Sequence, residues 1–391
     1  MQFVWRLNPW WEERTWEKKD KHLREFEYMP IKWIPKWISK LSMKPFSLNF
    51  IIGPRRVGKT TGIKLLLREL MKSANPFQIL YLDLELITDL KELRDAFLYY
   101  FRLRKERGVR KSFIFLDEVS RLYEWHRIVK GFIDLGEFKR DVLVISGSCS
   151  INLLKHAESF AGRRGHGKDV FVLPLSFKEF VEVSKVNPLR EDMLKTAFKD
   201  YTVVGGFPQS INRLTRGEEL IKAFEVEITR YDLSVEIAKQ ILSTIFELAP
   251  SAVSFNAIAS KIGKSNKTVE SYLETFQDLF IAKIVYWKDR KHVNFRKEKK
   301  IFLRDPFLAR SFAAWCNKDI RKDFLYEWIV QEHLFRKFGE IYYFRNGYEI
   351  DCIAGKELIE VKAGKSHRKY PKNVRVVDEN LLPKFLFQLS V

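Results

Sequence analysis

The stretch "SLNFIIGPRRVGKTTGIKLLLREL", residues 47–70, decides the fold. Its centre, Gly53 to Thr60, fits the P-loop pattern G-x-x-x-x-G-K-[ST] without a departure. An apolar segment precedes the pattern and a helical one follows it, which is the context that the pattern requires. The glycines let the backbone curl so that its N–H groups face phosphates, and the helix N-terminus adds positive potential.

This loop predicts a site for ATP and Mg²⁺. Lys59 is expected to reach the β- and γ-phosphates, and the Thr60 hydroxyl is expected to ligate Mg²⁺. The predicted nucleotide-binding residues are Gly53, Pro54, Arg55, Arg56, Val57, Gly58, Lys59, Thr60 and Thr61.

A second apolar segment, "SFIFLDEV" at 112–119, ends in two acids. At the carboxyl end of a strand, Asp117 can hold the magnesium through water. Glu118 can orient and deprotonate the attacking water, so the pair indicates hydrolysis as well as binding.

Two further segments extend this predicted catalytic site. In "VLVISGSCS" at 142–150, Ser146 or Ser148 could sense the γ-phosphate or align the water, and the sequence does not choose between them. In "AGRRGHGKD" at 161–169, Arg163 or Arg164 could stabilise charge in the transition state, from the same subunit or a neighbour. A solvated basic loop is the alternative.

The P-loop lies in a region, residues 46–175, where short apolar strands alternate with helices. The strands expected are "SLNFIIG", "FQILYLDL", "SFIFLDE" and "DVLVISGS". This order predicts an α/β fold with a parallel sheet covered on both faces. Residues 1–45 hold six of the ten tryptophans. We expect this arm to pack on the sheet domain, although its aromatic rings could also stack on bases or cover an adenine.

The chain after the P-loop domain changes character twice. Residues 176–236 are predicted to form a helical lid. Residues 237–305 hold three amphipathic helices and two strands around a basic loop, the order of a winged helix-turn-helix. Residues 306–391 mix helices with a hairpin and form the last predicted domain.

The predicted winged helix favours phosphate contacts over base readout. Its third helix, Lys267 to Phe280, could bring Tyr272 to base edges, but Glu270 and Glu274 would repel a phosphate backbone. The wing, "WKDRKHVNFRKEKK" at 287–300, is strongly basic. The predicted DNA-contacting residues are Lys264, Lys267, Thr268, Ser271, Arg290, Lys291, Arg296 and Lys297. The alternative is a module that binds protein.

The overall charge also points to a polyanionic partner. The formal net charge is +20 and the pI is about 9.6, which favours DNA. Only three cysteines occur, and we see neither a zinc pattern nor a signal peptide, so we expect a cytoplasmic protein. No apolar run is long enough for a membrane helix.

The order of motifs resembles that of archaeal and bacterial AAA+ ATPases related to the STAND and Orc-like groups. The motifs are "GPRRVGKTT", "FLDEVSRLYEW", "VISGSCS", "AGRRG", "LPLSFKEF" and "VGGFP". The resemblance implies a P-loop NTPase core, a helical lid, a winged helix and a C-terminal region similar to restriction-endonuclease-like nucleases. It also implies ATP hydrolysis by a chain that often forms homo-oligomers.

The C-terminal hairpin "GYEIDCIAGKELIEVKAG", residues 347–364, fits a nuclease pattern. Asp351 and Glu360 are separated by eight residues, and Lys362 shares a strand face with Glu360. With Glu327 on an upstream helix, these acids could hold a second Mg²⁺ or Mn²⁺ while Lys362 helps to form the attacking hydroxide. Lys365, Arg368 and Lys369 could add phosphate contacts.

These features predict an ATPase that binds DNA and processes it with the C-terminal domain. Two alternatives stay open. One is a nucleotide-regulated DNA-binding switch with an inactive nuclease fold. The other is a signalling ATPase whose winged helix binds protein.

Overall fold

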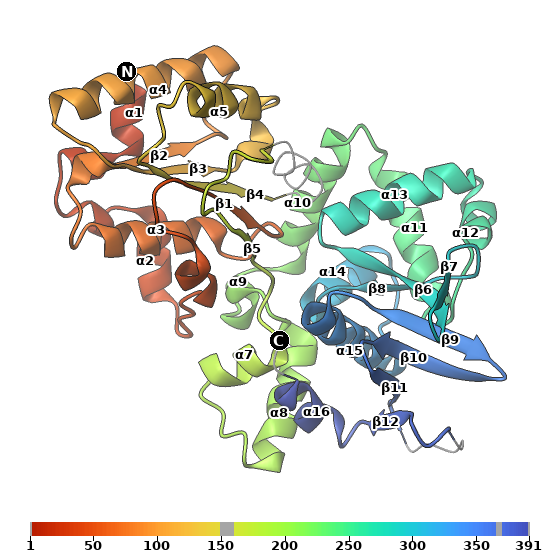
Figure 1. Ribbon diagram of the computed structural model, residues 1–391. Helices are drawn as coiled ribbons and strands as arrows, with labels where there is room; N and C mark the ends of the chain where they lie inside the picture. Colours follow the sequence, from red (N-terminus) through yellow and green to blue (C-terminus); the bar gives the residue numbers. More distant parts are fainter. Residues whose placement is uncertain (1, 149–159, 365–369, 390–391) are drawn as a thin grey trace. The chain divides into compact units, whose positions relative to one another are not determined.

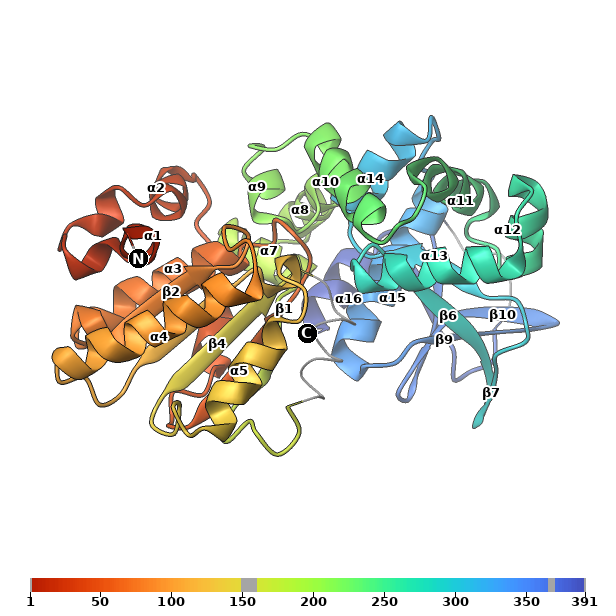
Figure 2. The ribbon, with the colours of Figure 1, turned by 90° about the horizontal axis from the view of Figure 1, so that it is seen from above.

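The structure is a computed structural model that describes residues 2–148, 160–364 and 370–389. The chain divides into two compact units, Met1–Leu173 and Pro174–Val391, each with its own sheet (Figures 1 and 2). Within these described ranges, none of the helices has both the length and the apolar character of a membrane span.

The first unit is built on a parallel sheet with the strand order β2-β3-β4-β1-β5. In Figure 1, α4 and α5 lie on one side of this sheet and α3 lies on the other. The predicted strands are confirmed, and their residues are almost completely buried. The elements are β1 Ser47–Ile52, α3 Lys59–Leu70, η4 Pro76–Gln78, β2 Ile79–Asp83, α4 Leu90–Glu106, β3 Phe113–Asp117, η5 Val119–Arg121, α5 Trp125–Asp134, β4 Val142–Gly147 and β5 Asp169–Phe171.

The tryptophan-rich arm packs against this unit, as predicted. The indole N–H groups of Trp10 and Trp11 both donate to the carbonyl of Ile79, at 3.2 and 3.0 Å. Trp37 lies so close to Gly62 of α3 that a Cβ there would be 2.3 Å from the indole ring. Trp10, Trp11 and Trp37 therefore serve as packing. Its helical elements are α1 Gln2–Leu7, η1 Pro9–Trp11, η2 Trp16–Lys18, α2 Lys21–Tyr28 and η3 Lys36–Lys40.

The second unit begins with the helices expected for residues 176–236. Ser176 and Glu179 form a capping box at the start of α7, which fixes where that helix begins. Three more helices follow, then the three helices and the strands predicted for a winged helix. The elements are α7 Phe177–Val183, α8 Glu191–Val204, α9 Pro208–Ile211, α10 Gly217–Arg230, α11 Val235–Leu248, α12 Phe255–Ile262, α13 Asn266–Asp278, β6 Ala282–Asp289, β7 His292–Asn294 and β8 Lys300–Leu303.

One sheet runs through the rest of this unit. Its order is β12-β11-β10-β9-β6-β7, and β8 pairs with β6. The strands predicted for the wing and those predicted for the C-terminal domain therefore share a single sheet, joined where β6 pairs in parallel with β9. The remaining elements are α14 Pro306–Trp315, α15 Lys322–Phe338, β9 Tyr342–Asn346, β10 Tyr348–Ala354, β11 Glu357–Lys362, β12 Arg375–Asp378 and α16 Leu382–Gln388.

The motifs "LPLSFKEF" and "VGGFP" meet at the N-terminus of α14. Asp305 caps that helix and accepts a 2.7 Å hydrogen bond from the Gly206 N–H, while Gly206 accepts one from the Leu175 N–H. A Cβ on Gly205, whose φ is +61°, would lie 2.2 Å from the Asp305 carboxylate. Burial raises the pKa of Asp305 to about 6. The glycines are therefore needed for this close approach.

Candidate functional site

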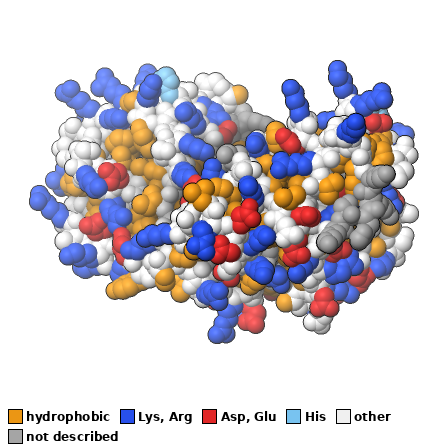
Figure 3. All heavy atoms as spheres, turned by 90° about the horizontal axis from the view of Figure 1, so that it is seen from below, with side chains coloured by type: hydrophobic (Ala, Val, Ile, Leu, Met, Phe, Trp, Pro, Cys, Tyr) orange, Lys and Arg blue, Asp and Glu red, His pale blue; other side chains and the backbone are white. Residues whose placement is uncertain are grey.

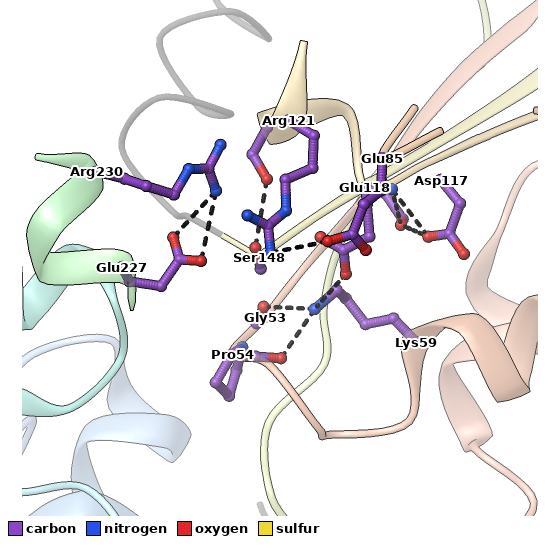
Figure 4. A network of polar contacts seen from close by, with 12 residues as sticks. Gly53, Pro54, Lys59, Glu85, Asp117, Glu118, Arg121, Ser148, Glu227 and Arg230 are labelled. Atoms are coloured by element: carbon purple, nitrogen blue, oxygen red, sulfur yellow. Dashed lines mark hydrogen bonds and ion pairs between the residues drawn. The ribbon is translucent and has the colours of Figure 1, made fainter. Parts of the chain in front are cut away.

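The P-loop of the first unit connects β1 to α3, in the strand–loop–helix order that its sequence predicts. Gly58, with φ of 90°, stands at the N-terminus of α3, and a Cβ on Gly53 would lie 1.9 Å from the Val172 carbonyl oxygen. The buried Lys59 ammonium donates to the carbonyl oxygens of Gly53 and Pro54, at 2.9 and 2.8 Å (Figure 4). Thr60 and Thr61 lie in the first turn of α3. The loop therefore brings the predicted lysine and hydroxyls to one helix end.

The predicted aspartate ends β3 and is held by its neighbours. The hydroxyl of Ser146, on the adjacent β4, donates to Oδ1 of Asp117, which also accepts the Glu118 N–H at 3.1 Å. The Tyr81 hydroxyl donates to Oδ2 at 3.0 Å. Ser148 instead has its Oγ 3.3 Å from that of Ser120. Of the two predicted serines, Ser146 is the one bonded to Asp117.

Glu118 lies between this aspartate and the P-loop lysine. Its Oε1 is 4.0 Å from the Lys59 ammonium, and its Oε2 is buried without a hydrogen-bond partner among the described residues. Burial raises the pKa of Glu118, while Lys59 opposes that rise. A carboxylate with a raised pKa and an available oxygen suits the acceptance of a proton from water.

Three side chains of this site were missed in the sequence, namely Tyr81, Asp83 and Lys64. The β2–β3 register places Asp83 beside Asp117, and burial together with Asp117 raises the pKa of Asp83 to about 6. The Lys64 ammonium lies 3.7 Å from the centre of the Tyr81 ring and 3.5 Å from Asp20 of the arm. The acid that ends the apolar segment "ILYLD" was a signal in the sequence that could have identified Asp83.

The two predicted arginines are both paired with carboxylates of the first unit. Arg163 donates to Asp134 at 2.7 Å, and Arg164 donates to Asp169 at 2.9 and 2.5 Å. A role for either arginine in catalysis stays a prediction, and it would require one of these ion pairs to break.

The predicted DNA-contacting residues lie on the surface of the second unit. Arg290, Lys291, Arg296 and Lys297 are exposed around β7, and so is Phe295. Lys264, Lys267 and Ser271 are exposed as well, and Thr268 is half-buried. Tyr272 is a correction, because it is buried and donates its hydroxyl to the Ser234 carbonyl at 3.3 Å. It therefore does not reach a base edge.

Basic residues do not form a single patch on the face shown in Figure 3. On the face shown in Figure 3, Lys and Arg side chains are spread widely, with Asp and Glu side chains among them. The net charge alone therefore does not mark a DNA-binding face.

Two of the predicted nuclease residues, Glu327 and Asp351, meet around Lys300, which was not predicted as part of this site. Lys300 of β8 lies 2.8 Å from carboxylate oxygens of Glu327, Glu349 and Asp351. Burial by itself would lower the pKa of Lys300, but these acids raise it well above its usual value. Burial and Asp351 raise the pKa of Glu327 well above the usual carboxyl range.

The remaining two nuclease residues pair with each other. Lys362 donates to Glu360 Oε1 at 2.5 Å, and the Tyr370 hydroxyl donates to the same oxygen at 2.8 Å. Burial and Asp351 raise the pKa of Glu360. Lys365, Arg368 and Lys369 lie outside the described residues. In the described parts of the chain, no group of three or more His, Cys, Asp and Glu residues is arranged to hold a metal ion. The predicted second Mg²⁺ or Mn²⁺ therefore gains no support.

Comparisons with protein families match two parts of the chain. Residues 46–181 match the model of an AAA domain family, and residues 195–319 match a domain of unknown function, DUF8612. The chain is 22% identical over 352 residues to an uncharacterized protein of Methanocaldococcus jannaschii, a match that covers 82% of this chain and 76% of that one. It is 25% identical over 281 residues to an uncharacterized protein of Haemophilus influenzae, covering 67% and 68%.

Comparisons with solved structures give weak likenesses. The Aeropyrum pernix ORC1 protein, solved in complex with DNA, has a TM-score of 0.35 at 12% identity, over 77% of this chain and 92% of that one. A structure of Thermotoga maritima RuvB has a TM-score of 0.34 at 16% identity, over 70% and 88%. Likenesses at this level do not show a function.

Proposed function

We propose that this chain is an AAA+-type ATPase that binds and hydrolyses ATP at the P-loop of its first unit. The observation that carries the proposal is the meeting of Lys59, Asp117, Ser146 and Glu118 beside an intact P-loop. The N–H groups of the loop and the N-terminus of α3 would bind the phosphates. Lys59 would exchange its bonds to the loop carbonyls for bonds to the β- and γ-phosphates.

The residues present fit a magnesium ion. The Asp117 carboxylate is buried and oriented by Ser146, Tyr81 and the Glu118 N–H, and a carboxylate has about four lone-pair sites, so one remains beyond those three bonds. Thr60 and Asp117 would hold the ion, and a bound Mg²⁺ would neutralise charge on the phosphate oxygens. Glu118 would take the proton of the attacking water at its unpartnered Oε2.

The nucleotide site is tested by Lys59→Ala. We expect this change to weaken ATP binding about tenfold or more, because a hydrogen bond to a charged group contributes about 1.5–3 kcal/mol. Titration with a fluorescent ATP analogue gives the affinity. The matched control is Lys72→Ala, since Lys72 follows the same helix but is exposed and pairs with Glu69. Equal affinities for the wild type and Lys59→Ala would contradict the assignment.

We further propose that the second unit binds DNA through the wing. Support comes from the order of α11–α13 and β6–β8 and from four exposed cations on the wing, Arg290, Lys291, Arg296 and Lys297. Glu270 and Glu274 are exposed on α13, so phosphate contact is favoured over base readout. ATP binding in a homo-oligomer would then control how the chain engages DNA.

The DNA proposal is tested by replacing those four wing residues with alanine. Each phosphate contact contributes about 0.9 to the slope of log affinity against log salt on duplex DNA. We expect the quadruple variant to bind more weakly and to lower the slope by about 2 to 4. Fluorescence anisotropy over a salt series measures both quantities.

The control for this series removes four exposed cations from the arm, Lys18, Lys19, Lys21 and Arg24. If the control lowers the slope as much as the wing variant does, the wing is not the contact surface. If the wild-type chain does not bind DNA at low salt, the DNA proposal fails and the protein-binding alternative gains.

DNA cleavage by the C-terminal residues has less support than ATP hydrolysis by the first unit. The inactive-fold alternative is favoured by one observation, the ammonium of Lys300 between Glu327 and Asp351. In that case the chain acts as a nucleotide-regulated DNA-binding switch.

A further inference from the structure

The acidic cluster of the second unit is organised around the side chain of Lys300. This side chain is 3% exposed. Its ammonium lies 2.8 Å from Glu327 Oε1, Asp351 Oδ1 and Glu349 Oε1. A lysine ammonium has three N–H donors and no acceptor; that of Lys300 donates hydrogen bonds to Glu327 and Asp351 and forms a further ion pair with Glu349.

Oxygens of Asp351 and Glu327 already accept hydrogen bonds from other groups of the protein. Asp351 uses Oδ1 for Lys300 and Oδ2 for the Val361 N–H, at 2.9 Å. Glu327 Oε1 accepts from both Lys300 and Gln331, at 2.8 and 2.9 Å. Mg²⁺ takes oxygen ligands at about 2.0–2.1 Å, so an ion bridging Glu327 and Asp351 would have to displace the Lys300 ammonium.

One observation favours a metal site at this cluster. Glu360 Oε2 is buried and has no hydrogen-bond partner among the described residues. A carboxylate oxygen that binds a metal ion would have the same surroundings in the absence of the ion. The other oxygen of Glu360, however, accepts from Lys362 and Tyr370. That one oxygen, Oε2, would give an octahedral cation a single protein ligand, with water in every other position.

We propose that Lys300 is a built-in cation that takes the place of the metal at this nuclease-like cluster. The C-terminal region then keeps the arrangement of a D…E-x-K site without binding Mg²⁺ or Mn²⁺ and without cleaving DNA. Because Lys300 belongs to β8 while its partners belong to α15 and β10, the cluster also ties the wing strands to the rest of the sheet. Removing one partner of such a buried ionic cluster leaves uncompensated charge.

The test measures Mn²⁺ binding to the full-length, nucleotide-free protein by electron paramagnetic resonance. We expect the wild type and Asp351→Asn to bind Mn²⁺ equally weakly, since Asp351 is engaged by Lys300. Lys300→Met frees the carboxylates, and we expect its Mn²⁺ affinity to rise at least about tenfold, with thermal stability that increases as Mn²⁺ is added. The matched control is Lys299→Met, because Lys299 is also buried but lies over the Phe255 ring.

Three results would overturn the proposal. The first is a wild-type Mn²⁺ site that is lost in Asp351→Asn. The second is a folded Lys300→Met protein, with an unchanged melting profile, that gains no Mn²⁺ affinity. The third is Mn²⁺-dependent cleavage of duplex or branched DNA by the wild type that disappears in Asp351→Asn. If Lys300→Met does not fold, the comparison of wild type with Asp351→Asn still decides, and equal weak binding supports the proposal.

Discussion

Replacing Glu118 with glutamine is expected to lower the kcat of ATP hydrolysis by about 1000-fold, while ATP still binds. A positioned general base contributes about 10²- to 10⁴-fold to a rate, and glutamine keeps the shape of the side chain but does not accept the proton of the attacking water. Lys59 and Asp117 stay in place, so phosphate and magnesium binding should be retained. Steady-state turnover and ATP-analogue titration measure the two quantities separately.

The control for this prediction is Glu85→Gln. Glu85 is half-exposed and pairs at 3.3 Å with Arg121, whose side chain is 15% exposed. Because the Glu85 carboxylate itself is at the surface, its loss should change kcat less than about threefold. If turnover is unchanged in Glu118→Gln, Glu118 is not the base. If ATP binding falls along with turnover, the main role of Glu118 is to hold the loop lysine.

The sheet of the first unit was predictable where strands are long and apolar. β1, β2, β3 and β4 follow that rule, and all four were found in the sequence. β5 was missed because it has three residues, of which Asp169 and Phe171 are exposed. It exists because β1 offers it an edge, and this tertiary pairing leaves no periodic signal.

The nucleotide site also contains some residues that the sequence predicts and others that only the fold brings to the site. Lys59, Asp117 and Glu118 were predicted because each stands in a recognisable local motif. Which of Ser146 and Ser148 is bonded to Asp117 was not predictable, because it depends on the position of each side chain at the end of β4. Tyr81 reaches Asp117 from 36 residues away, through pairing that only the folded sheet specifies.

At the C-terminal cluster, the sequence pattern predicted the secondary structure but not the central lysine. The hairpin of β10 and β11 and the helix that carries Glu327 were predicted from spacing. Lys300 was not assigned to the cluster, because it is 27 residues from Glu327 and 51 from Asp351. In the sequence it belongs to a basic wing, whereas in the fold it is buried among acids.

A second buried ionic cluster lies in the second unit, and removing one of its members should be strongly destabilising. Glu332 of α15 accepts two hydrogen bonds of 2.9 Å from Arg304 and one of 2.7 Å from Arg336. All three side chains are at most 9% exposed. Burial by itself would raise the pKa of Glu332, but the two arginines lower it below its usual value. The carboxylate is therefore ionised and balances two buried cations.

We expect Glu332→Gln to lower the free energy of unfolding of this unit by about 3–5 kcal/mol, because removing one partner leaves buried charge uncompensated. Urea denaturation followed by tryptophan fluorescence measures the change, and Glu270→Gln on the exposed face of α13 should stay within about 0.5 kcal/mol of the wild type.

The pH dependence separates loss of charge from loss of packing. A carboxyl with a lowered pKa stabilises the folded state above its unfolded pKa, and this contribution is lost as the pH falls through the folded pKa. The difference between wild type and Glu332→Gln should therefore be full near neutral pH and shrink below the ordinary carboxyl value of 4.5. A difference that stayed constant down to acid pH would instead mean that glutamine disturbs the packing of α15, and that the charge of Glu332 contributes little.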